Sequence, residues 1–190
     1  MPGQTPFQTV GPFFHDGLGW EGGEDLVRPE TRGERIAIRG QVLDGDGKPV
    51  PDALIEIWQA NAEGRYNHPE DRQEKPLDPA FMGFGRSPTR ADGSFRFATI
   101  RPGRVPGRDN TLQAPHINLG LFSRGLLRRL VTRIYFEDCP EISEDPVLAL
   151  IPDQARRATL FARRSAGADG VVYRFDIRLQ GEGETVFFDC

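Results

Sequence analysis

Residues 38–66 constrain the fold most, because they place two strand-like runs on either side of a tight turn. Apolar and polar side chains alternate loosely over residues 35–44 and again over residues 53–58, which is the period of a β-strand. Asp and Gly at residues 44–47 favour a turn, and the two prolines that follow exclude a helix. A pair of strands buries its apolar face only against another sheet, so the sequence predicts a protein of packed β-sheets.

The same period of two recurs along most of the chain. We expect further strands at residues 94–100, 114–122, 130–136, 159–164 and 171–179, and a last edge strand at residues 185–188. Proline and glycine are frequent at residues 60–93 and 101–110, which predicts two loops, the first of them long. The expected fold class is all-β, a two-sheet β-sandwich with long loops that forms a single domain over residues 1–190.

Residues 145–160 are the best candidate for helical structure. Asp145 can cap a helix, and Pro146 suits the first helical position. Pro152 would divide the stretch, because proline cannot continue a helix that has already begun. We therefore expect one or two short helices beside the sandwich.

Residues 1–34 form an N-terminal segment that is rich in glycine, proline and charge. The segment also carries Phe7, Phe13, Phe14 and Trp20, and a free tail rarely has so many aromatic side chains. We expect this segment to be an arm that docks, either on the core of its own chain or on a neighbouring chain.

The charge balance excludes several classes of partner. The chain has 24 basic and 28 acidic residues, a net charge of -4, whereas proteins that bind nucleic acids or membrane surfaces need a basic excess. Cys139 and Cys190 are the only cysteines, so neither a disulfide framework nor a zinc cluster is expected. The N-terminus lacks the features of a signal peptide and no apolar run is long enough for a membrane span, so we expect a cytoplasmic location.

Arg133 is the residue whose setting most suggests a functional role. In the expected strand at residues 130–136 it shares a face with Val131 and Tyr135. An unpaired charge among apolar neighbours is costly to bury, so a buried Arg133 would need an anion. The alternative is a surface arginine whose charged end extends into water.

Four segments of the chain resemble the intradiol ring-cleaving dioxygenases. They read EIWQANAEGRYNH at residues 56–68, RPGRVPGRDNTLQAPHINLGLF at 101–122, RLVTRIYF at 129–136 and YRFDIRLQGEGETVFFD at 173–189. In that family, a ferric ion is held by two tyrosines, in G-x-Y and P-G-x-Y-P patterns, and by the two histidines of an H-x-H pair. Phenolate oxygens are hard anionic ligands that favour ferric iron. The resemblance covers nearly the whole chain and implies the β-sandwich fold of the family.

Two of the four ligands are missing at the matching positions of this chain. Tyr66 and His116 match the first tyrosine and the first histidine, whereas Val105 and Asn118 stand at the second positions. Valine donates no electron pair, and a neutral amide oxygen binds Fe(III) far more weakly than an imidazole does. The resemblance therefore implies that this chain holds no iron, that Tyr66 packs on the sandwich, and that His116 is an internal histidine with a satisfied ring.

This pattern of loss is similar to that of a non-catalytic subunit in the family. Such a chain assembles with a homologous beta chain into a hetero-oligomer, and the beta chain holds the Fe(III). A small aromatic diol and O2 are the substrates that the resemblance implies. It also implies that Thr9, Gly11 and Pro12 of the arm lie over the active site of the partner, and that Arg133 lies beside the substrate pocket, where it can complement a carboxylate.

Two other interpretations remain open. The chain could be a non-enzymatic β-sandwich module for binding or interaction, since the strand-turn-strand unit at residues 38–66 also begins many such modules. It could also be an autonomous dioxygenase with unusual ligands, which Val105 and Asn118 disfavour. In the first case the N-terminal arm would only fill a hydrophobic groove.

Overall fold

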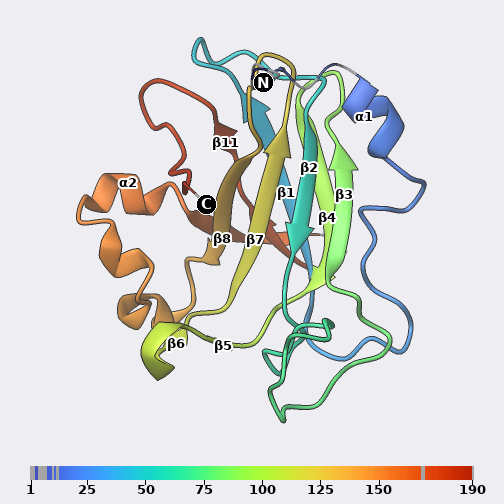
Figure 1. Cartoon of the computed structure of the whole chain (residues 1–190), viewed down its shortest axis with the longest axis vertical. Coiled ribbons are helices and arrows are strands. Elements are labelled where there is room, and N and C mark those ends of the chain that lie inside the picture. Colours follow the sequence, from blue (N-terminus) through green and yellow to red (C-terminus); the bar gives the residue numbers. More distant parts are fainter. Residues whose placement is uncertain (1–2, 4–7, 10, 12, 168–169, 190) are drawn as a thin grey trace.

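The computed structural model describes residues 3, 8–9, 11, 13–167 and 170–189, and it confirms the all-β sandwich (Figure 1). One layer contains β3 (Phe84–Pro88), β2 (Leu54–Trp58), β7 (His116–Phe122) and β8 (Leu130–Phe136). The other contains β4 (Ser94–Ile100), β1 (Arg35–Leu43), β10 (Gly170–Arg174) and β11 (Ile177–Arg178). In Figure 1, β1 lies behind β7 and β2.

The two layers belong to one folded sheet, and β9 (Phe161–Gly167) joins them. Phe161 and Ala162 pair in parallel with the end of β8. Residues 163–167 then pair antiparallel with β10. The sheet thus passes from one layer to the other along β9, and side chains from both layers form a single buried core.

Short elements complete the described structure. These are α1 (Phe13–Leu18), β5 (Val105–Pro106), β6 (Leu112–Gln113), α2 (Gln154–Ala158) and the 3-10 helices η1 (Arg108–Asn110), η2 (Pro140–Glu144) and η3 (Leu148–Leu150). Strands β5 and β6 pair with each other in a separate small sheet. None of the helices in the described part of the chain has the length and apolar character that a membrane crossing requires.

Strand β1 is the centre of its layer, with β4 on one side and β10 and β11 on the other. Its apolar residues at every second position are buried, as the alternation predicted. Gly40 faces the break between β10 and β11, where a Cβ atom would lie 1.8 Å from the carbonyl oxygen of Phe175. The close approach of these strands therefore requires glycine at this position.

The turn that follows β1 forms as the sequence predicted. Oδ1 of Asp44 accepts hydrogen bonds from the backbone N–H groups of Asp46 and Lys48, at 2.9 and 2.8 Å. Gly47 adopts a positive φ of 77°, a conformation that glycine reaches without steric cost. The turn therefore returns the chain toward β2 as a strand-turn-strand unit.

The prediction of one long loop over residues 60–93 was wrong in one respect, because this stretch contains the strand β3. This strand pairs antiparallel with all of β2. Its inward positions are Gly85 and Ser87, so it lacks the large apolar residues that would have revealed an alternating pattern. Pro88 is tolerated because β3 lies at an edge of the sheet.

The expected strand at residues 185–188 was also wrong. The described chain there makes a single bridge, in which the backbone N–H of Phe188 donates to the carbonyl oxygen of Val131 at 2.8 Å. The hydroxyl of Thr132 donates to the carbonyl oxygen of Val186. The backbone N–H of Val186 donates to Oγ1 of Thr159. Side-chain hydrogen bonds thus replace part of a strand ladder in this segment.

Short helices form at residues 145–160, as predicted. Oδ1 of Asp145 accepts hydrogen bonds from the N–H groups of Val147 and Leu148, both at 2.9 Å, and caps the segment that contains η3. Asp153 caps α2 in the same way, directly after Pro152. The proline therefore divides the stretch where the sequence indicated.

The described part of the arm docks on its own chain. Leu26 is buried in the core, and its N–H donates to the carbonyl oxygen of Ala98 in β4 at 2.9 Å. The ring of Trp20 stacks on Phe84 of β3, with 6.1 Å between ring centroids. Helix α1, which the sequence did not predict, contacts the end of β7 through Phe14 and Phe122, with 5.3 Å between ring centroids.

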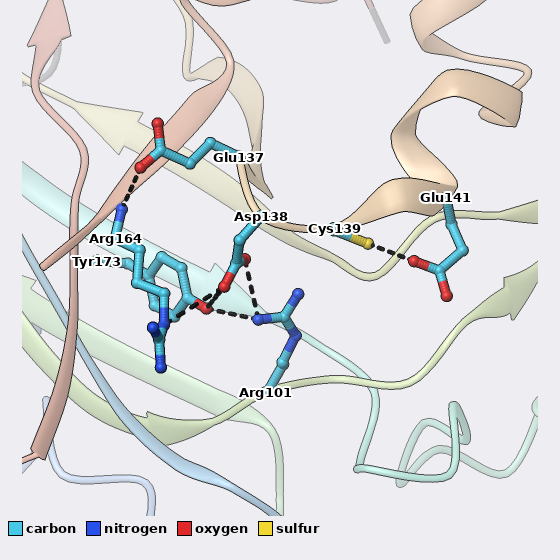
Figure 2. A network of polar contacts seen from close by, with 7 residues as sticks. All are labelled: Arg101, Glu137, Asp138, Cys139, Glu141, Arg164 and Tyr173. Atoms are coloured by element: carbon cyan, nitrogen blue, oxygen red, sulfur yellow. Dashed lines mark hydrogen bonds and ion pairs between the residues drawn. The ribbon is translucent and has the colours of Figure 1, made fainter.

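A polar network links the ends of strands from both layers (Figure 2). Asp138, just after β8, accepts hydrogen bonds from Arg101 at 3.0 Å and from the hydroxyl of Tyr173 at 2.9 Å, and pairs with Arg164 at 3.4 Å. The Arg101 guanidinium also lies 5.0 Å from the ring centroid of Phe136. Burial, followed by the hydrogen bond to Asp138, raises the pKa of Tyr173 to about 12, so its hydroxyl stays a donor.

Candidate functional site

Tyr66 lies in a tight turn after β2 and packs on the sandwich. Oδ1 of Asn61 accepts hydrogen bonds from the N–H groups of Glu63 and Arg65 and so fixes the turn. The ring of Tyr66 stacks on Trp58, with 5.6 Å between centroids and 20° between planes. Burial raises the pKa of Tyr66 above its ordinary value, so the phenol keeps its proton at neutral pH.

Asn118 is bound to Tyr66 directly. Its Nδ2 donates to the hydroxyl oxygen of Tyr66 at 3.0 Å and to the carbonyl oxygen of Trp58 at 3.2 Å. In the β7–β8 ladder, Asn118 is paired with Arg133. The amide nitrogen that donates has no lone pair for a metal, so the neutral amide oxygen is the one weak donor left on Asn118.

His116 lies two residues before Asn118 on β7 and is buried. Its Nδ1 is 2.8 Å from the carbonyl oxygen of Ala114, which assigns the ring proton to that nitrogen. The ring lies 5.6 Å from that of Tyr135, its pairing partner on β8. Burial and, after it, the charge of Arg133 lower the pKa of His116 to about 4, so the imidazole is neutral near pH 7.

Val105 lies in β5, where it pairs with Gln113 of β6. Its side chain is buried and offers no donor atom. Together with Trp58 and Tyr66 it lines a cavity of about 620 Å³. The position thus has space beside it, but the Val105 side chain itself offers no atom that could bind a cation.

Arg133 is half-buried on β8 and lies on the same face as Val131 and Tyr135. Its Nη1 donates to Oε1 of Gln113 at 2.6 Å and to the hydroxyl oxygen of Tyr135 at 3.2 Å. Its guanidinium carbon is 6.0 Å from the ring centroid of Phe188. Within the described part of the chain, both hydrogen bonds of Arg133 start at Nη1 and neither acceptor is a carboxylate.

The arm residues of the predicted site lie at the opposite end of the sandwich from the small β5–β6 sheet. Oγ1 of Thr9 accepts a hydrogen bond from the N–H of Gly125, in the loop that joins β7 and β8, at 2.7 Å. The carbonyl oxygen of Gly11 accepts from the N–H of Phe14 as α1 begins. Pro12 lies outside the described residues.

The structure therefore gathers Tyr66, Val105, His116, Asn118 and Arg133 into one region and leaves Thr9 and Gly11 outside it. The sequence reasoning missed two members of this region. Gln113 was hidden because its contact with Arg133 spans 20 residues. Asp145 was interpreted only as a helix cap, yet its Oδ1 also accepts from the hydroxyl of Tyr135 at 3.2 Å. The position of Tyr135 two residues after Arg133 was the one available signal.

Comparison with known proteins decides the family. A family model described as Dioxygenase matches residues 11–181. The chain belongs to the intradiol dioxygenase family. It is 43% identical to the protocatechuate 3,4-dioxygenase alpha chain of Pseudomonas putida, over 98% of this chain and 96% of that one. It is 41% identical to the beta chain of the Burkholderia cepacia enzyme, over 94% of this chain and 76% of that one.

Solved structures support the same fold for this intradiol dioxygenase family member. The dioxygenase domain of a carbohydrate-binding fusion protein from a Streptomyces species is 26% identical, with a TM-score of 0.62 over 83% of this chain and 87% of that one. Catechol 1,2-dioxygenase from Pseudomonas arvilla C-1 has a TM-score of 0.63 at 22% identity, over 83% of this chain and 55% of that one. The second likeness concerns the fold alone.

The residues of this site do not fit the ferric ion that the family generally uses. Val105 has no donor atom, and Asn118 presents an amide nitrogen that donates to Tyr66. Tyr66 and His116 are the two strong donors left among the four positions, and the phenol of Tyr66 is held protonated. Within the described residues, no group of three His, Cys, Asp or Glu side chains is placed to hold a metal ion.

Proposed function

We propose that this chain is the non-catalytic alpha subunit of a protocatechuate 3,4-dioxygenase. The observation that carries the proposal is its near full-length match, at 43–44% identity, to the alpha chains of two bacterial enzymes. The match to a beta chain of similar identity covers only 76% of that longer protein. Val105 and Asn118 support the same assignment, because they remove two donors from the family's metal site.

The assembled enzyme would cleave protocatechuate with O2 to 3-carboxy-cis,cis-muconate, a step in aromatic catabolism through the beta-ketoadipate pathway. The bond between the two hydroxylated ring carbons breaks, and both atoms of O2 enter the product. A homologous beta chain would hold the Fe(III), and this chain would form part of the pocket wall in an alpha/beta hetero-oligomer. No step of the chemistry is assigned to the four former ligand positions of this chain.

Arg133 is the side chain that we propose for contact with the substrate. A guanidinium has five N–H donors, and Nη1 alone is used within the described residues. The other donors are available to an anion, and the half-buried position would strengthen a hydrogen bond to a carboxylate. Protocatechuate carries such a carboxylate, whereas catechol does not.

Thr9, Gly11 and Pro12 are proposed to line the partner's pocket rather than a pocket of this chain. What supports this is the position of Thr9 beside the β7–β8 loop, away from Tyr66 and Val105. An arm that begins at this end of the sandwich can extend onto a neighbouring subunit. Thr9, Gly11 and Pro12 would then be substrate-binding residues that form one wall of the pocket.

Co-expression with a beta chain tests the proposal. An affinity tag on this chain should co-purify the beta chain in equal amount, and the complex should consume O2 when protocatechuate is added. The tagged chain alone should show no such consumption. A chain that stays separate from the beta chain, or an isolated chain that turns over protocatechuate, would refute the assignment.

A further inference from the structure

Arg133 is linked to all four former ligand positions through strand pairing and hydrogen bonds. Asn118 is its pairing partner across the β7–β8 ladder. The two acceptors of its Nη1 are Gln113, which pairs with Val105, and Tyr135, which pairs with His116. Paired residues in such a ladder have Cβ atoms about 5 Å apart, so both hydrogen-bond acceptors of Arg133 are direct neighbours of former ligand positions.

The fourth position, Tyr66, is connected to Arg133 through Asn118. The hydroxyl of Tyr66 accepts a hydrogen bond from Asn118, which stands opposite Arg133. A positive charge held by hydrogen bonds is therefore present beside the former ligand positions.

The acceptors that hold this charge are neutral. Gln113 contributes an amide oxygen and Tyr135 a hydroxyl oxygen. Asp145 is reached only through the hydroxyl of Tyr135, and its two oxygens also accept N–H groups of Ala114, Val147 and Leu148. The charge of Arg133 is thus positioned by hydrogen bonds without a carboxylate in direct contact in the described part of the chain.

We propose that Arg133 takes the place of the metal's positive charge in this site and excludes a metal ion from it. The loss of ligands at Val105 and Asn118 is then only half of the change, and restoring the donor side chains alone does not restore metal binding. Like charges a few ångströms apart repel strongly in a site shielded from water, and a trivalent ion is affected most. This inference concerns residues of this chain alone and holds whether or not a beta chain binds.

Three variants of the full chain test the proposal with ferric citrate as the probe. Val105→Tyr with Asn118→His restores the donor types, and the cavity of about 620 Å³ beside Val105 can accept a phenol. Adding Arg133→Gln removes the charge but keeps an N–H donor for Gln113, and adding Arg133→Lys keeps a charge. Bound iron is measured by elemental analysis and by the visible tyrosinate-to-iron absorption, after circular dichroism has shown that each variant is folded.

The triple variant with Arg133→Gln should bind iron at least about tenfold more tightly than the double variant, because a neighbouring positive charge has been removed. The triple variant with Arg133→Lys should behave like the double variant. Arg128→Gln in the double background is the matched control. It removes one positive charge from an exposed side chain that pairs with Asp189.

A milder pair of variants keeps the proposal testable if the phenol at position 105 prevents folding. Asn118→His alone is compared with Asn118→His plus Arg133→Gln, and the same increase in iron binding is expected. Equal iron binding with and without Arg133 in the folded pair would overturn the proposal. So would an Arg133→Lys variant that binds iron as well as the Arg133→Gln variant does.

Discussion

Asn118 shows how a single side chain changes the chemistry of this site. A histidine at this position would offer a nitrogen lone pair, but the amide nitrogen of Asn118 donates to Tyr66 and to the backbone of Trp58. The exchange ties the Tyr66 hydroxyl to the sheet through one hydrogen bond. Val105 contributes only hydrocarbon beside it. At the scale of the residue, Val105 and Asn118 explain why this site lacks a full set of metal-ligand atoms.

Arg133→Ala in the assembled enzyme should damage turnover while assembly and iron content stay unchanged. A hydrogen bond to a charged group contributes about 1.5–3 kcal/mol, so its loss should lower kcat/KM for protocatechuate by roughly 10- to 100-fold. If the contact is to the carboxylate, catechol should suffer a smaller loss. Steady-state kinetics with both substrates measures this, and Arg128→Ala is the control on an exposed arginine. Unchanged kinetics in an intact Arg133→Ala complex would remove Arg133 from the proposed pocket.

The stability of the chain should fall as the pH falls from about 6.5 to about 4, in part because of His116. The folded-state pKa of His116 is lowered from 6.5 to about 4 by burial and by Arg133, against the opposing effect of Asp145. Between these pH values the unfolded chain binds a proton that the folded chain does not, so the free energy of unfolding decreases by up to about 3 kcal/mol. Above pH 6.5 both states are neutral at this residue and the full contribution is present.

Urea unfolding of the wild type and of His116→Asn at several pH values measures this effect. The variant lacks the titrating ring, so its stability should decline less over the same pH range. An equal decline in the two proteins would show that His116 does not titrate as its burial implies.

At the scale of the element, alternation in the sequence was enough to locate β1, β2, β4, β7 and β8. It failed where inward positions are small, as in β3, where Gly85 and Ser87 face the core. It also failed at residues 185–188, a short apolar run whose backbone is held in part by threonine hydroxyl groups. Helix α1 escaped prediction because its stability comes from contacts such as that of Phe14 with Phe122, which local sequence does not show.

Gly40→Ala should destabilise the chain strongly through the junction of β1 with β10 and β11. The added Cβ would lie 1.8 Å from the carbonyl oxygen of Phe175, so the strands must separate. The expected loss is about 3 kcal/mol, because backbone groups cannot yield as a side chain can. Thermal or urea unfolding measures the loss. Gly45→Ala in the adjacent turn is the control, since its nearest neighbour would lie 3.4 Å away, and a similarly small effect at Gly40 would contradict this explanation.

At the scale of the whole molecule, the site combines what the sequence could indicate with what only the fold could provide. The resemblance to a family identified Tyr66, Val105, His116 and Asn118 by their positions in motifs. The contact of Arg133 with Gln113 depends on the arrangement of β6 beside β8, which no local pattern contains. The fold gathers the four former ligand positions in one region that lacks a full set of metal-ligand atoms. It places Thr9 at the other end of the sandwich, beside the β7–β8 loop.

Iron content and activity measured together give the most direct test of the proposed division between subunits. This chain, a beta chain and their co-purified complex are each analysed for iron, visible absorption and O2 consumption with protocatechuate. We predict that this chain alone is colourless, free of iron and inactive, and that the complex contains one iron per alpha/beta pair and is active. Stoichiometric iron in the isolated chain, or two irons per pair in the complex, would contradict the proposed role.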